Sequence, residues 1–68
     1  NFYPNPTSGK VAINIDGDFN VIVYKVLGNI IRETKNNSID LSNEKNGIYF
    51  IKIIKDNNTE IGKIILNR

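Results

Sequence analysis

Apolar residues occur along the chain in short runs that alternate with polar positions, and clusters of Asn, Asp and Gly separate the runs. A period of two places every second side chain on one face, which is typical of β-strands and not of helices. Asn and Asp hydrogen-bond their own backbone and accept left-handed conformations, so the clusters indicate turns. The pattern predicts six strands, at 11–15, 20–27, 30–31, 38–41, 48–55 and 59–66.

The last two predicted strands are unusual because both of their faces are largely apolar. In 48–55, one face carries Tyr49, Ile51 and Ile53 and the other carries Ile48, Phe50, Lys52 and Ile54. We expect this strand to be central, with Lys52 on the wetter face. In 59–66, one face carries Ile61, Lys63 and Ile65, and the other carries Gly62, Ile64 and Leu66. The simpler interpretation is an ordinary buried strand; the alternative is a core face backed by a docking face.

Composition strengthens the β interpretation and limits the core. The 68 residues include 13 Ile but only three Leu and one Ala. β-Branched side chains lose rotamer freedom in helices and pack well on a pleated surface. A chain this short is a single domain that buries about 60% of the surface its unfolded form exposes, so the core is thin. We therefore predict an all-β sandwich or barrel over 1–68.

The chain contains no Cys and no His. Disulfides, thiol nucleophiles and Cys-type metal clusters are therefore excluded, and the commonest general base is missing. Nine basic and seven acidic residues are scattered without a run of like charge, which indicates a solvated surface. No apolar stretch approaches the roughly 18 residues of a membrane-spanning helix. We expect no enzyme, cofactor, metal, nucleic-acid partner or direct membrane insertion, and a chain opening on Asn1 suggests a piece of a longer precursor.

One calcium-like pattern fails on geometry. Asp16, Asp18 and Asn20 have the spacing of the first three ligands of a calcium loop. However, Val21 stands where that loop needs Gly for its sharp turn, and Leu27 stands where it needs a bidentate Glu. A turn is the better interpretation of this segment.

Two further chemistries are weakly indicated. Asp40 and Glu44 are the nearest carboxylates within one loop, but we expect no pocket of ~300 Å³, the size a glycoside-cleaving pair would need, in so small a domain. Tyr49 and Phe50 lie in a stretch that loosely resembles an RNA-binding strand. Because they are adjacent, they point to opposite faces and do not form a stacking platform.

Four segments, taken in order, resemble the type A C-terminal sorting domain of the type IX (Por) secretion system. Residues 3–10 read YPNPTSGK and resemble the family's YPNPxxG opening, and residues 22–28 are similar to its I-Y-N-V-L-G segment. Residues 40–53 resemble D-L-S-x-L-P-x-G-x-Y-F-V-K-I, and Lys63-Ile64-Ile65 resembles the basic-apolar terminal strand. Glu44 and Lys45 replace the usual Leu-Pro, which leaves the turn there undetermined.

The resemblance implies a secretion-targeting role and not a catalytic one. It implies an immunoglobulin-like β-sandwich of about six to seven short antiparallel strands, at the C-terminus of a larger cargo secreted by Bacteroidetes-type bacteria. The domain would be recognised in the periplasm and taken through the outer-membrane translocon with a shuttle protein. A surface sortase would then remove it, leaving the cargo released or anchored at the cell surface. The residues that the resemblance marks for recognition are Tyr3, Pro4, Asn5, Pro6, Gly9, Leu27, Gly28, Gly47, Tyr49, Lys63, Ile64 and Ile65.

The residues themselves suit such a role but also have simpler explanations. Pro4 and Pro6 stiffen the N-terminal segment 1–9, which lowers the entropy lost when a receptor orders it. A final strand at a sheet edge could pair with a partner's backbone, and we expect deletion of the last five residues to block export while the domain stays folded. The alternatives are a domain boundary, turns and core packing. The competing function is an immunoglobulin-like accessory module, carbohydrate-binding, on a secreted enzyme; it would present a row of exposed aromatic residues.

Overall fold

The computed structural model describes residues 2–3 and 7–68, with side chains from Thr7 onward. The described residues form seven strands and no helix, so none of them belongs to a helix that could cross a membrane. The strands are β1 (Phe2–Tyr3), β2 (Lys10–Ile13), β3 (Asn20–Lys25), β4 (Ile30–Thr34), β5 (Ser38–Asp40), β6 (Gly47–Lys55) and β7 (Asn58–Leu66). The predicted all-β class is confirmed.

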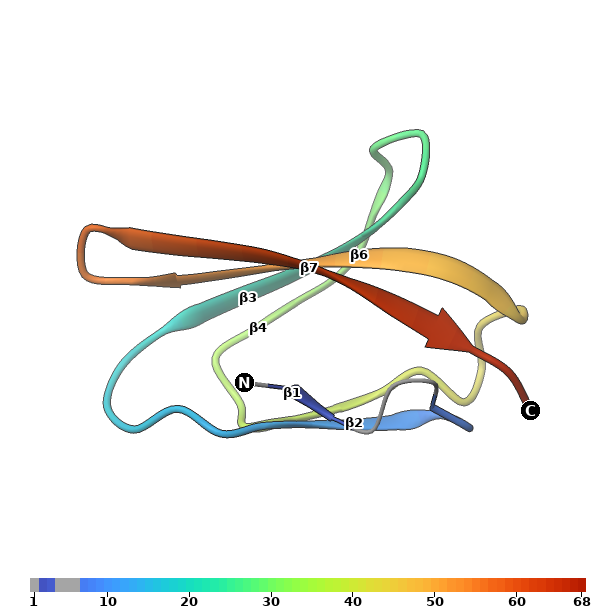
Figure 1. The fold of residues 1–68 in the computed structure, drawn as a ribbon, viewed down its shortest axis with the longest axis horizontal. Coiled ribbons are helices and arrows are strands. Elements are labelled where there is room, and N and C mark those ends of the chain that lie inside the picture. Colours follow the sequence, from blue (N-terminus) through green and yellow to red (C-terminus); the bar gives the residue numbers. More distant parts are fainter. Residues whose placement is uncertain (1, 4–6) are drawn as a thin grey trace.

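The strands form two antiparallel sheets that face each other (Figure 1). One sheet has the order β1-β2-β5 and the other has the order β4-β3-β6-β7. In the lettering of immunoglobulin domains the first sheet is A-B-E and the second is C′-C-F-G. The fourth strand is lettered C′ because β4 pairs with β3 and not with β5. This is the sandwich that the resemblance implies, and β6 is central, as predicted.

The core fills the space between the two sheets. Every second residue of β3 and β6 points inward, which confirms the predicted faces: Tyr49 and Ile51 are buried, whereas Phe50 and Lys52 lie on the opposite side. The buried apolar residues are Val11, Ile13, Phe19, Val21, Val23, Ile39, Leu41, Tyr49, Ile51, Ile53, Ile64 and Leu66. Ile15, predicted to share the face of Val11 and Ile13, is only partly buried and packs against this cluster.

The last strand, β7, is not the ordinary buried strand that the simpler interpretation predicted. Ile64 and Leu66 are buried, but Ile61 is 59% exposed and Ile65 is 37% exposed. The prediction is wrong because the three-stranded sheet covers only the inner face of the four-stranded sheet. An apolar pattern on two faces therefore does not imply burial on two faces.

The predicted strand 20–27 was two residues too long, because its apolar pattern continues into a turn. The N–H of Gly28 donates to the carbonyl of Lys25 at 2.8 Å, and the N–H of Lys25 donates to that of Asn29 at 2.9 Å. Gly28 has φ of +96°, as required by a three-residue hairpin loop that ends in a left-handed residue. Val26 and Leu27 occupy the exposed tip of this hairpin, which projects beyond the upper sheet in Figure 1.

Candidate functional site

The residues marked for recognition fall in two regions of the structure. Leu27, Gly47 and Tyr49 line one groove, and Gly28 adjoins it in the hairpin loop. Lys63, Ile64 and Ile65 lie on β7, at the edge of the four-stranded sheet. Predictions for Pro4, Asn5, Pro6 and the side chain of Tyr3 fall outside the described residues. The backbone of Tyr3 pairs with Ala12 in β1 and β2.

The first region, the hairpin groove, lies between the tip of the β3–β4 hairpin and residues 43–49. Its volume is about 480 Å³, and its lining consists of Lys25, Val26, Leu27, Asn29, Asn43, Glu44, Lys45, Asn46, Gly47, Ile48 and Tyr49. The expectation that the domain holds no pocket larger than ~300 Å³ is therefore wrong. A small domain can hold this volume because the hollow is open and is formed by a hairpin that extends past the sheet.

The hairpin tip offers apolar surface that folding leaves in water. Leu27 is 91% exposed and Val26 is 65% exposed, although both residue types are usually buried. Removing a Leu side chain from water stabilises a complex by about 1.5–3 kcal/mol. A partner could therefore cover Leu27 without disturbing the core.

Tyr49 and Gly47 contribute to the groove in other ways. Tyr49 is only 5% exposed, and its hydroxyl donates to the carbonyl of Lys45 at 2.6 Å. The ring thus belongs to the core and fixes the start of β6. Gly47 leaves open space, since a Cβ there would meet no atom within 4 Å.

The loop between β5 and β6 forms a wall of the groove and is shaped by Asp40. The N–H of Ser42 donates to Asp40 Oδ1 at 2.9 Å, and the N–H of Glu44 donates to the carbonyl of Leu41 at 2.9 Å. Hydrogen bonds from the side chain and backbone of Ser42 lower the pKa of the Asp40 carboxyl from its ordinary value of 3.8. The chain thus turns at this point without the Leu-Pro pair of the family pattern.

Two arginines, Arg32 and Arg68, hold this loop against the rest of the fold. Arg32 Nη1 on β4 lies 3.3 Å from Glu44 Oε2, and Arg32 Nη2 donates to the carbonyl of Asp40 at 3.4 Å. From the C-terminus, Arg68 donates to the carbonyl of Leu41 at 3.4 Å and to that of Glu44. The sequence did not predict the role of either arginine. The one feature that could have indicated it is that a guanidinium offers five hydrogen-bond donors.

The second region joins the N-terminal segment to the last strand through Thr7. The N–H of Thr7 donates to the carbonyl of Ile65 at 2.8 Å, and the N–H of Asn67 donates to that of Thr7 at 2.9 Å. This forms a parallel bridge between Thr7 and Leu66. β7 is an edge strand, as predicted, but the predicted strand addition by a partner is wrong at 65–67, because the chain's own segment fills that position.

The Thr7 side chain and Gly9 complete this junction. Thr7 is 2% exposed; its hydroxyl donates to the carbonyl of Lys10 at 2.7 Å and accepts from the N–H of Gly9 at 3.1 Å. The carbonyl of Gly9 accepts from the N–H of Leu41 at 2.7 Å. A Cβ on Gly9 would lie 3.1 Å from the Cβ of Ser42, so the absence of a side chain permits this close approach.

The acidic residues do not build a metal site in the described part of the chain, where no three His, Cys, Asp or Glu side chains converge. Comparison with known proteins gives one clear result. A family model described as "Secretion system C-terminal sorting domain" matches residues 1–67. No curated protein matches the chain.

Proposed function

Because the chain belongs to the family of Por secretion system C-terminal sorting domains, we propose that it directs a covalently linked N-terminal cargo across the outer membrane. As a type IX secretion-signal domain it is of a class that is typically non-catalytic, and its cargo is a secreted or surface protein. In this proposal the shuttle protein and the translocon recognise the folded domain in the periplasm. A surface sortase then removes it, and the cargo is released or anchored.

The observation that carries this proposal is the exposure of Leu27 at the rim of the hairpin groove. Folding leaves this side chain 91% exposed, beside Lys25 and Lys45. A residue that contributes little to the core but lies in a segment similar to the family pattern is best explained by recognition. We assign Leu27 as the anchor, Gly28 as the residue that shapes its turn and Gly47 as the open floor.

An accessory carbohydrate-binding module is the second candidate, and one aromatic pair favours it. Tyr24 and Phe50 stack with ring centroids 5.8 Å apart and an interplanar angle of 27°. Each ring, however, covers one face of the other, and both are only partly exposed. Because sugar-binding platforms need open ring faces, this pair supports carbohydrate binding less well than the groove supports sorting.

An export assay tests the proposal. A reporter protein with a signal peptide is fused in front of residues 1–68 and produced in a bacterium with an active type IX system. We expect the reporter at the cell surface or in the medium, and retention in the periplasm would contradict the proposal. A polysaccharide pull-down with the isolated chain tests the second candidate.

Substitutions at position 27 assign the effect to recognition. Leu27→Ser should reduce export at least about fivefold, since it removes the apolar anchor, while Leu27→Met keeps an apolar side chain and should export normally. Both variants should melt at the wild-type temperature, because the side chain is exposed. Equal export of the two variants would show that Leu27 is not the anchor.

Truncation is a less clean test than the sequence suggested. Deleting the last five residues would remove Ile64 and Leu66, whose side chains are 0% and 1% exposed. The expectation that this deletion leaves the domain folded is therefore not supported by the packing. Deleting only residues 67–68 removes contacts of Arg68 and Asn67 while leaving every core side chain in place.

A further inference from the structure

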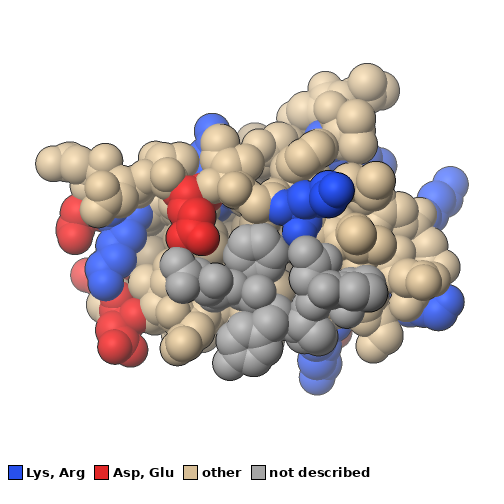
Figure 2. Space-filling view, viewed as in Figure 1, with Lys and Arg blue, Asp and Glu red and all other residues tan. Residues whose placement is uncertain are grey.

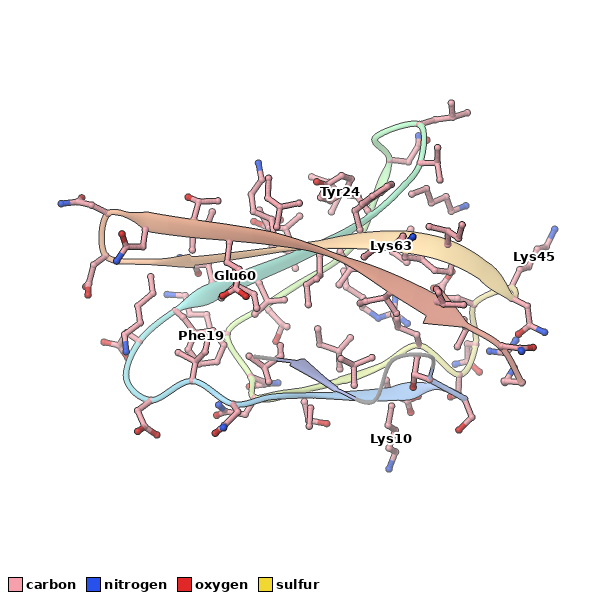
Figure 3. All side chains as sticks on the ribbon, in the orientation of Figure 1. Lys10, Phe19, Tyr24, Lys45, Glu60 and Lys63 are labelled. Atoms are coloured by element: carbon pink, nitrogen blue, oxygen red, sulfur yellow. The ribbon has the colours of Figure 1, made fainter. Side chains whose placement is uncertain are left out.

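The face of the four-stranded sheet that points away from the core, here the outer face, is largely apolar. The strand registers place one set of apolar residues on it: Ile22, Tyr24, Ile30, Ile48, Phe50, Ile54, Ile61 and Ile65. Ile30 and Ile61 are each 59% exposed and Ile48 is 47% exposed. Figure 3 shows Tyr24 above this sheet, whereas Phe19 lies between the layers. Continuous apolar surface of this kind marks an interaction site on a small domain.

The outer face is hollowed where a partner's side chains could enter. A depression of about 270 Å³ is lined by Ile22, Tyr24, Gly28, Ile30 and Lys52. It lies beside the β3–β4 hairpin, whose left-handed Gly28 carries no side chain to fill it. The face therefore offers a groove-like seat and not a uniformly flat sheet.

The charged residues on this face are mostly basic. Lys52 lies opposite Ile61 in the register of β6 and β7, and Lys63 lies opposite Phe50. The only acidic residue at an outward register position of the four strands is Glu33, on β4.

Most other acidic residues lie at one end of the molecule. Figure 2 shows acidic side chains gathering toward the end that carries the β6–β7 hairpin, where Asp56 and Glu60 lie. Asp16 belongs to the same end, since Lys55 Nζ donates to its carbonyl. The outer face is thus mainly apolar, its charged residues are mostly basic, and most acidic side chains lie elsewhere, at the β6–β7 hairpin end.

These charges argue against two occupants. A second copy related by two-fold symmetry would bring Lys52 and Lys63 toward the same pair of lysines, and like charges at an apolar interface are unfavourable. An anionic membrane is typically held by a cluster of about 4–8 basic residues, whereas this face presents two and also carries Glu33.

We propose that the outer face binds an amphipathic α-helix whose apolar stripe is flanked by Asp or Glu. Helices cover apolar sheet faces throughout layered proteins, because an apolar stripe and an apolar sheet face exclude water together. From Ile48 to Ile54 the face extends about 20 Å along β6, which matches a helix of about 13 residues. Carboxylates beside the stripe would meet Lys52. This site borders the hairpin groove at Ile48 and extends from there over the sheet, and it does not depend on the sorting role.

Binding of two designed peptides to the 68-residue chain tests the proposal. Each is a lactam-stapled helix of 14 residues with a Leu stripe; one carries Glu at the flanking positions and the other carries Lys. We expect the Glu peptide to shift the NMR signals of Ile22, Phe50 and Ile61, and to bind at least about tenfold more tightly than the Lys peptide.

Two charge-reversed variants complete the test. Lys52→Glu should weaken binding of the Glu peptide about tenfold. Lys10→Glu makes the same change on the opposite sheet, where Lys10 points away from the core in Figure 3, and should leave affinity unchanged. Equal affinity for both peptides, or no binding of either, would overturn the proposal. So would NMR shifts confined to the hairpin groove, dimerisation through Ile61, or binding to phosphatidylserine vesicles instead of the Glu peptide. The export assay is independent of every one of these outcomes.

Discussion

The two faces of the four-stranded sheet are built from the same residue types but do different things. On the inner face, Val21, Val23 and Ile51 are 0% exposed, and on the outer face Ile61 is 59% exposed. The residues do not differ in hydrophobicity, so the difference lies in what covers them. The three-stranded sheet packs on one side only, so the inner face holds the core, while the outer face and the hairpin tip stay exposed for the proposed recognition.

Neighbouring isoleucines on β7 test this division most strongly. Ile64 is fully buried opposite Tyr49, and Ile65 is 37% exposed opposite Ile48. Ile64→Ala should cost about 2–5 kcal/mol of unfolding free energy, because it leaves a cavity in a thin core. Ile65→Ala should cost less than about 1 kcal/mol. Urea unfolding monitored by circular dichroism measures both, and similar losses would show that the outer face also carries the fold.

Threonine hydroxyls give a second buried-versus-exposed pair. Thr7→Val removes a buried hydroxyl, so the N–H of Gly9 and the carbonyl of Lys10 lose their hydrogen-bond partner. This should lower the free energy of unfolding by about 1–3 kcal/mol. Thr34→Val removes an exposed acceptor of the Asn36 N–H, and its cost should stay within about 0.5 kcal/mol. The same unfolding experiment compares them. A small effect at Thr7 would mean that the N-terminal segment is not an integral part of the sandwich.

Sequence reasoning reached the fold but only part of the site, for physical reasons. Alternation of apolar residues reports which side chains share a face, so the inward positions of Tyr49 and Ile51 were predictable. It does not report whether a second layer covers that face, which is why the exposure of Ile61 was not predicted. Turn glycines such as Gly28 were recognisable locally.

The junctions between distant segments were beyond sequence reasoning. Thr7 binds Ile65, and Arg68 binds Leu41, because the two-sheet topology brings these segments together. No local pattern encodes such a pairing. Similarly, Leu27 and Gly47 share a groove only because β3 and β6 are neighbours in the sheet.

The exposed hairpin tip allows a test of backbone conformation without packing. A Cβ on Gly28 would meet no atom within 4 Å, so Gly28→Ala changes only the strain of a residue held at φ of +96°. We expect a cost of about 1 kcal/mol. Asn tolerates the left-handed region better, so Gly28→Asn should cost less. If both variants are as stable as the wild type, the tip rearranges freely and its geometry is not fixed by the hairpin.

Asp40, at an exposed turn, should give the smallest effect and a defined pH dependence. Its pKa is lowered in the folded state by the hydrogen bonds of Ser42, so its ionised form stabilises the turn. This contribution is present above the ordinary pKa of 3.8 and is lost as the pH falls through the lower folded-state value. Asp40→Asn keeps an oxygen acceptor for the Ser42 N–H but removes the charge. The difference in stability between wild type and variant should therefore be small at pH 7 and should disappear once the pH falls below the lowered folded-state pKa of Asp40. Thermal melts across this range measure it, with Asp18→Asn, outside the turn, as the control. A difference that grows toward low pH would have the wrong sign, and it would mean that this wall of the groove is not held by the Asp40 carboxylate.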